Sequence, residues 1–115
     1  MVALIILSSA LICFQGQCHH ALVGSDTPTG VFSVVHMLTD QPGYGGDVLV
    51  FAQTKTTVFA IHRVWLRIPT QHRAERLASD DPIERKTVTR GCINVAPDIY
   101  DELQDLTTVE IRQDP

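Results

Sequence analysis

Residues 2–23, VALIILSSALICFQGQCHHALV, decide the fold of this chain. Val2 to Leu7 and Ala10 to Phe14 are short runs rich in Val, Ile, Leu and Phe, which is typical of buried strands. The dipeptide Gln15-Gly16 then predicts a tight turn, because glycine adopts the backbone angles that a two-residue hairpin requires. His19 to Val23 continues the returning strand. The chain therefore begins with antiparallel β-structure.

Two cysteines are predicted to face each other across this hairpin. In the register set by the turn, Cys13 lies opposite Cys18, and facing positions bring the β-carbons within disulfide reach. A disulfide and a pair of free thiols both stay open at this point. A zinc site made of these cysteines with His19 and His20 is disfavoured, because adjacent strand residues point to opposite faces. No metal or other cofactor is predicted.

Composition bounds the class of protein. A chain of 115 residues that is 44% apolar is long enough to bury one core, so residues 1–115 are expected to form one domain. A net charge of -4 with no basic field argues against a nucleic-acid partner. Three cysteines are too few for a disulfide-rich miniprotein, and their odd number leaves one thiol over if two are paired.

The first 25 residues carry no Lys, Arg, Asp or Glu. The longest unbroken apolar run, Met1 to Leu7, is far shorter than the roughly 20 residues that span a bilayer, so no membrane span is expected. A signal peptide normally starts with a basic region, which this stretch lacks. Cleavage after Ser8-Ser9-Ala10 stays open as a weaker alternative to a buried strand.

The rest of the chain predicts more strands, two short helices and one glycine-rich loop. Helices are expected at Pro69–Ala78 and Pro97–Leu106, each beginning with proline. The loop is Asp40–Asp47, which holds three of the seven glycines. Extended segments are expected at Val31–Leu38, Val48–Ala52, Thr57–His62, Lys86–Val95 and Thr108–Arg112. This order indicates a mainly β, sandwich-like domain and not a βαβ array.

Cys92 and His62 are the candidates for chemistry. Cys92 follows a glycine in the segment TRGCIN, residues 89–94, and a thiol becomes a nucleophile when a base or cation favours the thiolate. His62 closes a predicted strand, where a rigid scaffold presents functional groups. Only the fold can bring the two together. A buried, inert Cys92 and a half-exposed His62 are the alternatives.

Three segments, in this order, resemble the L,D-transpeptidase catalytic domain (YkuD-type), a family of β-sandwich cysteine acyltransferases that cross-link bacterial peptidoglycan. DTPTGVF at 26–32 resembles the family's TPxGxF turn, AIH at 60–62 its histidine strand, and TRGCIN at 89–94 its [ST]xGCxN motif. The opening hairpin and the final helix and strand also fit. The sequence departs from the family in two places. Arg90 stands where the family has His, and the segment between His62 and Cys92 is longer than usual. We place the excess in Ile68–Glu84, which is expected to form a lid or a specificity wall.

The resemblance implies roles for particular residues. Cys92 would be the nucleophile and His62 the general base, oriented by the Arg63 backbone carbonyl, while backbone N–H groups around Gly91 and Cys92 would stabilise the oxyanion. The candidate substrate-binding residues are Arg90, Thr89, Asn94 and Tyr44, and ordinary surface, strand, turn and loop roles are their alternatives. Trp65 is expected in the core or the pocket wall, His36 as a bystander, and His72 as a second-choice base.

The implied activity is acyl transfer on peptidoglycan stem peptides, with release of D-alanine and transfer to an amine acceptor. An L,D-carboxypeptidase or a D-amino-acid exchange enzyme, including a secreted antibacterial toxin, is the enzymatic alternative. An inactive peptidoglycan-binding module is the alternative from another class. The expected location is the periplasm or outside the cell, and the oligomeric state stays open.

Overall fold

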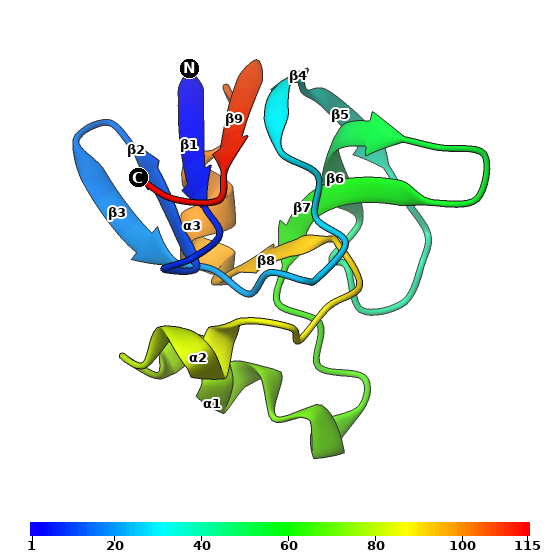
Figure 1. The fold of residues 1–115 in the computed structure, drawn as a ribbon. Helices are drawn as coiled ribbons and strands as arrows, with labels where there is room; N and C mark the ends of the chain where they lie inside the picture. The colour runs from blue at the N-terminus through cyan, green and yellow to red at the C-terminus, as the bar shows by residue number, and fades with distance from the viewer.

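Two β-sheets form the framework of the computed structural model, which describes residues 1–115 (Figure 1). The five-stranded sheet runs in the spatial order β3 (Gln17–His20), β2 (Leu11–Phe14), β1 (Val2–Ile6), β9 (Thr108–Arg112) and β4 (Gly30–Ser33). The four-stranded sheet runs in the order β5 (Val35–Leu38), β6 (Asp47–Gln53), β7 (Val58–Arg63) and β8 (Ile93–Val95). The predicted mainly β sandwich with few, short helices is confirmed.

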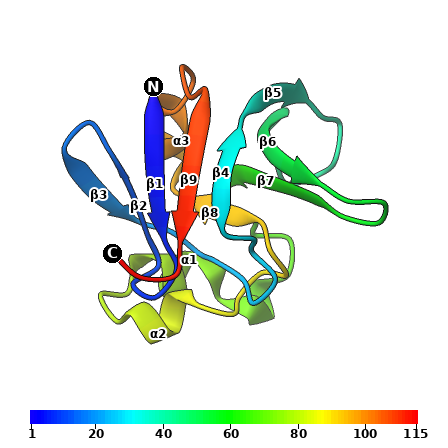
Figure 2. The ribbon, with the colours of Figure 1, turned by 45° about the horizontal axis from the view of Figure 1, so that its top comes forward.

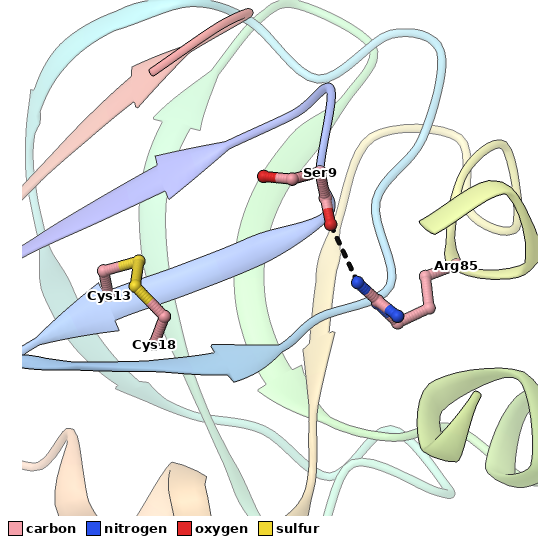
Figure 3. The surroundings of a disulfide bond; sticks show 4 residues. All are labelled: Ser9, Cys13, Cys18 and Arg85. Atoms are coloured by element: carbon pink, nitrogen blue, oxygen red, sulfur yellow. Dashed lines mark hydrogen bonds between the residues drawn. A yellow bond between two sulfur atoms is a disulfide. The ribbon is translucent and has the colours of Figure 1, made fainter. Parts of the chain in front are cut away.

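The opening hairpin has the predicted register. Cys13 pairs with Cys18 and Phe14 with Gln17 between β2 and β3. The two facing cysteines form a disulfide, which Figure 3 shows between the neighbouring strands. Because both sulfurs are used in this bond, neither is available to the zinc arrangement considered above. Cys92 is the free cysteine.

The core lies between the first sheet, the second sheet and helix α3 (Pro97–Glu102). Ile5 from β1, Ile61 from β7 and Tyr100 from α3 are all fully buried in it. The helix ends earlier than the predicted 97–106, but Leu103 and Leu106 still enter the core from the turn that follows. Strand β9 then inserts beside β1 as its parallel partner, in the interior of the sheet.

The prediction of one strand at Val31–Leu38 is wrong, because this stretch contributes to both sheets. β4 pairs with β9 in the first sheet, and β5 pairs with β6 in the second. Between them Val34 leaves both ladders and donates its N–H to the carbonyl of Thr107 at 2.9 Å. A stretch rich in valine and other residues common in strands favours extension along its whole length but does not specify where the pairing partner changes.

The segment between β7 and β8 forms a separate helical layer. It contains the 3₁₀ turn η1 (Pro69–Gln71), α1 (Arg73–Ala78) and α2 (Pro82–Arg85), and both views place α1 and α2 together at one end of the molecule (Figures 1 and 2). The predicted helix at 69–78 is interrupted at His72, which has a left-handed φ of 52°. None of the helices has the length and apolar character that crossing a bilayer requires.

Two further expectations for this part of the chain are corrected. Helix α2 was not predicted; Asp81 begins it by accepting a hydrogen bond from the N–H of Ile83 at 3.0 Å. The predicted extended segment Lys86–Val95 is strand only at β8, with one isolated bridge between Thr89 and Gly24.

Arg85 attaches the helical layer to the first sheet. Its side chain is 2% exposed, and its guanidinium donates to the carbonyl of Ala10 at 3.2 Å, to that of Ser9 at 2.8 Å, and to that of Ser79. Figure 3 shows the contact with Ser9, in the turn between β1 and β2. One buried side chain therefore satisfies carbonyl oxygens from two distant parts of the chain.

We expect Arg85→Met to destabilise the fold. Methionine keeps much of the packing volume but donates no hydrogen bond. The Ala10 carbonyl keeps the Ala21 N–H, but the carbonyls of Ser9 and Ser79 lose their donor, and an acceptor left without a donor costs about 1–3 kcal/mol. Urea unfolding should report a loss of that size, with Arg112→Met as the control at an exposed arginine of β9. Equal stability of the two variants would contradict the role given to Arg85.

Candidate active site

A pocket of about 350 Å³ at the junction of β7, the glycine-rich loop and the helical layer contains both candidate chemical groups. Cys92 and His62 line it, together with Tyr44, Thr89, Arg90 and Gly91. The structure thus brings together most of the residues singled out in the sequence. A larger groove of about 710 Å³ between α1 and α2 is polar and contains no nucleophilic cysteine.

His62 is held in one tautomer by its own strand. The side chain is 3% exposed, and Nδ1 lies 2.7 Å from the backbone carbonyl oxygen of Arg63. Because a carbonyl oxygen only accepts, Nδ1 carries the proton and Nε2 of the neutral ring is left to accept one. Burial lowers the pKa of His62 to about 4; the Arg63 carbonyl opposes this and the charge of Arg73 adds to it. The imidazole is therefore neutral at pH 7.

Cys92 lies directly before β8, which begins beside the middle of β7 and does not reach the start of that strand. Ile93 is the first β8 residue paired with β7, opposite Ile61, so the preceding part of β7 pairs with β6 on one edge but has no strand on the other. The Cys92 side chain occupies that place: its thiol donates to the Val58 carbonyl over 3.7 Å, and the N–H of Ala60 donates to the sulfur. Burial raises the pKa of this thiol, while the Ala60 N–H and the charge of Arg73 oppose the increase.

The two pKa shifts together describe the resting state of the site. A raised thiol pKa and a lowered imidazole pKa favour neutral thiol and neutral imidazole over a thiolate–imidazolium pair. In this state the thiol has the Val58 carbonyl as its acceptor and makes no hydrogen bond with His62. Such geometry is common before substrate binds, since catalytic hydrogen bonds often tighten only in the complex.

The TPTG turn supports the segment that carries the cysteine. Thr27 is 7% exposed, and its hydroxyl donates to the Gly91 carbonyl at 2.9 Å. The N–H of Asp26 donates to the Arg90 carbonyl at 2.9 Å, and the Thr89 hydroxyl donates to the Cys92 carbonyl at 2.6 Å. These bonds use carbonyls on both sides of the nucleophile candidate and fix the backbone around it.

Gly91 is required by the packing of the site. A β-carbon at this position would lie 2.3 Å from the Phe59 ring, closer than carbon atoms approach. No backbone carbonyl accepts the N–H of Gly91 or of Cys92. The absent side chain lets this backbone pass directly over β7.

Gly91→Ala is expected to displace the cysteine segment from β7. Relieving the contact with Phe59 requires a shift of the ring or of the backbone, and overpacking of this kind costs about 1–3 kcal/mol. Thermal unfolding should show the loss, and the alkylation rate of Cys92 should change with it. The double variant Gly91→Ala/Phe59→Leu should recover part of both, because leucine is smaller than the ring. No recovery in the double variant would contradict this cause.

The glycine-rich loop is anchored at the pocket and places Tyr44 against His62, with ring centroids 4.3 Å apart. Arg63 holds the loop by donating to the Tyr44 carbonyl at 3.0 Å and to the Asp47 carboxylate at 2.7 Å. Trp65 forms another wall and donates from its indole N–H to the Pro42 carbonyl at 3.3 Å. Burial raises the pKa of Tyr44, and the Cys92 charge adds to the increase.

The placement of Asn94 corrects one expectation. Its side chain is fully buried and does not line the pocket, so direct contact with substrate does not fit the structure. Instead Oδ1 accepts from the backbone N–H of Trp65 at 3.1 Å and from the Arg73 guanidinium at 3.0 Å. Asn94 is the middle residue of β8, whose three residues are all buried. Through these two hydrogen bonds it positions the pocket wall.

Among the other histidines, His72 is exposed outside the pocket and lies 3.9 Å from Glu75. His36 pairs with Asp47 on the far side of the loop. Neither takes the place of His62.

Arg73 is the pocket residue that sequence reasoning missed. It belongs to α1, inside the segment expected to form a lid or wall, and its guanidinium stacks on Trp65 at 5.1 Å from the ring centroid. Arg90, in contrast, lines the pocket from an exposed position without an ion pair. No local pattern distinguishes Arg73 from Arg76 of the same helix; the tertiary contacts with Asn94 and Trp65 do so.

Comparison with known proteins bears on the fold. No family model and no curated protein sequence matches the chain. Among solved structures, it is similar to the crystal structure of the L,D-transpeptidase (residues 123–326) from Xylanimonas cellulosilytica DSM 15894, with 17% identity and a TM-score of 0.57. The match covers 96% of this chain and 59% of that one. The two-sheet structure described above is therefore an L,D-transpeptidase-like β-sandwich.

Proposed function

We propose that residues 1–115 form one catalytic domain, a cysteine acyltransferase of the L,D-transpeptidase type that acts on peptidoglycan stem peptides. The observation that carries the proposal is the shared pocket of the free thiol Cys92 and of His62, whose Nδ1 is fixed on the Arg63 carbonyl. The fold of the solved L,D-transpeptidase supports it. The work of such an enzyme is done in the cell envelope or outside the cell.

The first step is acylation. The Cys92 thiol gives its proton to His62 Nε2, and the sulfur attacks the carbonyl that joins the L-centre of the diamino acid to the terminal D-alanine. The N–H groups of Gly91 and Cys92, which no backbone carbonyl uses, are suited to hold the oxyanion. The C–N bond then breaks, the imidazolium protonates the departing D-alanine amine, and a thioester remains on Cys92.

The second step determines the product. An amine acceptor that attacks the thioester forms a new amide and restores the thiol, which gives a cross-link. Water gives a free carboxylic acid, which is carboxypeptidase activity, and a free D-amino acid gives exchange. All three outcomes use the same acyl-enzyme.

Mass spectrometry with a tetrapeptide stem tests the proposal. We expect a covalent adduct on Cys92 and release of one D-alanine per thioester formed. Repeating the reaction with and without an amine acceptor separates a transpeptidase, which needs the second stem, from a carboxypeptidase. The absence of both adduct and released D-alanine would refute the acyltransferase.

A binding module without activity is the second candidate, and one observation favours it. The Cys92 thiol is bonded to Val58 and not to His62, and burial raises its pKa, so the resting sulfur is not activated. Such a module would bind stem peptides in the same experiment without forming an adduct.

A further inference from the structure

The pocket carries positive charge that nothing in the protein neutralises. Arg73 and Arg90 line it, and no Asp or Glu does, although the chain has a net charge of -4. Its remaining walls are aromatic or neutral, including Tyr44 and Trp65. A ligand that complements this surface carries negative charge.

Arg73 is oriented by neutral groups only. Nη1 donates to Asn94 Oδ1 at 3.0 Å, Nε donates to Gln71 Oε1 at 2.8 Å, and the guanidinium stacks on Trp65. The Asn94 side chain cannot rotate freely, because it is fully buried and its Oδ1 also accepts a hydrogen bond from the backbone N–H of Trp65. A planar guanidinium has five N–H donors, of which two are used here, so about three are left for a ligand.

The cation lines the same pocket as the nucleophile. Its charge opposes the increase in the pKa of the Cys92 thiol and acts on Tyr44 in the same pocket. A guanidinium without a carboxylate partner, half-buried and held in one orientation, is suited to paired hydrogen bonds with a planar carboxylate. The segment between β7 and β8 therefore brings a fixed anion-binding group to the reaction centre.

We propose that Arg73 is the specificity-determining residue of this site and binds a carboxylate of the acyl donor next to Cys92. This deepens the proposed function and, for the donor peptide, rests on it. The donor carboxylate has two possible sources, the C-terminus of the leaving D-alanine and the free carboxylate of the diamino acid. Asn94 acts as the positioning residue that aims the guanidinium.

Alkylation of Cys92 tests the subsite without any peptidoglycan. Iodoacetate and iodoacetamide react alike, since the thiolate displaces iodide and forms a thioether, but only iodoacetate carries a carboxylate. Both reagents use the same thiolate, so any effect on the thiol pKa cancels in the ratio of the two rate constants. Cys92 is the free cysteine, which restricts the reaction to the site.

We expect the iodoacetate-to-iodoacetamide ratio to fall roughly tenfold in Arg73→Gln, the size expected for one lost charge-assisted hydrogen bond pair. Arg67→Gln, an exposed arginine outside the pocket, should leave the ratio unchanged. If Arg73→Gln fails to fold, Arg73→Lys keeps the charge without the planar pair of donors and should lower the ratio partly. An unchanged ratio in a folded variant overturns the proposal.

Donor peptides identify which carboxylate is bound. The variant Cys92→Ala lacks the nucleophile, so it binds the peptide without reacting. Trp65 fluorescence then measures the affinity for three peptides: the stem with free carboxylates, the stem amidated at its C-terminus, and the stem amidated at the diamino acid. In Cys92→Ala we expect amidation of the carboxylate that Arg73 binds to weaken binding roughly tenfold, and amidation of the other to have little effect. In Cys92→Ala/Arg73→Gln the three peptides should bind with equal affinity, because the preference for the free carboxylate is lost. A double variant that weakens binding of all three peptides by the same factor, and so keeps that preference, overturns the proposal. If wild type forms no acyl-enzyme but the iodoacetate-to-iodoacetamide ratio still falls in Arg73→Gln, the proposed function is refuted and the anion-binding role of Arg73 is not.

Discussion

Replacing Cys92 with alanine is expected to abolish thioester formation and D-alanine release, a loss of at least about 10³-fold, because removal of the nucleophile leaves only binding and oxyanion contacts. Structure should be unaffected, since the side chain is only half-buried and its sulfur makes only weak hydrogen bonds, to the Val58 carbonyl and from the Ala60 N–H. Intact-mass analysis of the protein with a tetrapeptide stem measures the adduct. Amino-acid analysis of the same samples measures D-alanine.

The matched control for this prediction is Cys13→Ser/Cys18→Ser. It removes the disulfide, which does not line the pocket, and leaves the free thiol in place. It should be less stable but should still form the adduct at a temperature where it is folded. Adduct or turnover in Cys92→Ala, or its loss in the folded double serine variant, would contradict the assignment of the nucleophile.

His62→Gln is expected to lower kcat/KM about 10²- to 10⁴-fold, the range found for a lost general base. Glutamine keeps the polar character of the position but accepts no proton. The wild-type pH profile should be unusual as well, because the base has to be unprotonated. With a pKa of about 4 for His62 in place of 6.5, activity should persist below pH 6 and fall near pH 4.

Stability measurements give an independent check on His62. Between pH 6.5 and about 4 the unfolded chain protonates this imidazole and the folded chain does not, so the unfolded state binds more protons. The free energy of unfolding should therefore fall as pH decreases through this range. The decrease should be smaller in His62→Gln, with Arg63 and the rest of the site unchanged. A wild-type activity profile with its acidic limb near pH 6.5, or a free energy of unfolding that does not change between pH 6.5 and 4, would show that His62 is not buried as described.

Local patterns were sufficient for the opening hairpin. Its two-residue turn determines the pairing of Cys13 with Cys18, because the register follows from the turn length. The same reasoning found β9 at 108–112 with correct ends. It failed for Val31–Leu38, where the strand character is continuous but the pairing partner changes at Val34.

The helical layer shows a second limit. Helix formers and an initial proline indicate a helix in 69–78, but the break at His72 comes from a left-handed residue that no propensity selects. Arg73 enters the pocket because Asn94, 21 positions further along the chain, and Trp65, before the helix, hold it. A local pattern does not predict such contacts. Asn94 was expected to meet substrate, yet its place in β8 buries it.

By itself the sequence determined the strands of the hairpin and the mainly β class, which depend on short-range spacing and on residue type. The resemblance of its motifs to those of L,D-transpeptidases put forward Cys92 and His62 as the candidates for chemistry. Only the tertiary structure decided that the thiol rests on Val58, that the imidazole is buried on the Arg63 carbonyl, and that Arg73 lines the same pocket. The physical reason is the parallel pairing of β7 with β8, a contact between distant segments that sets burial, hydrogen bonding and charge at the site together.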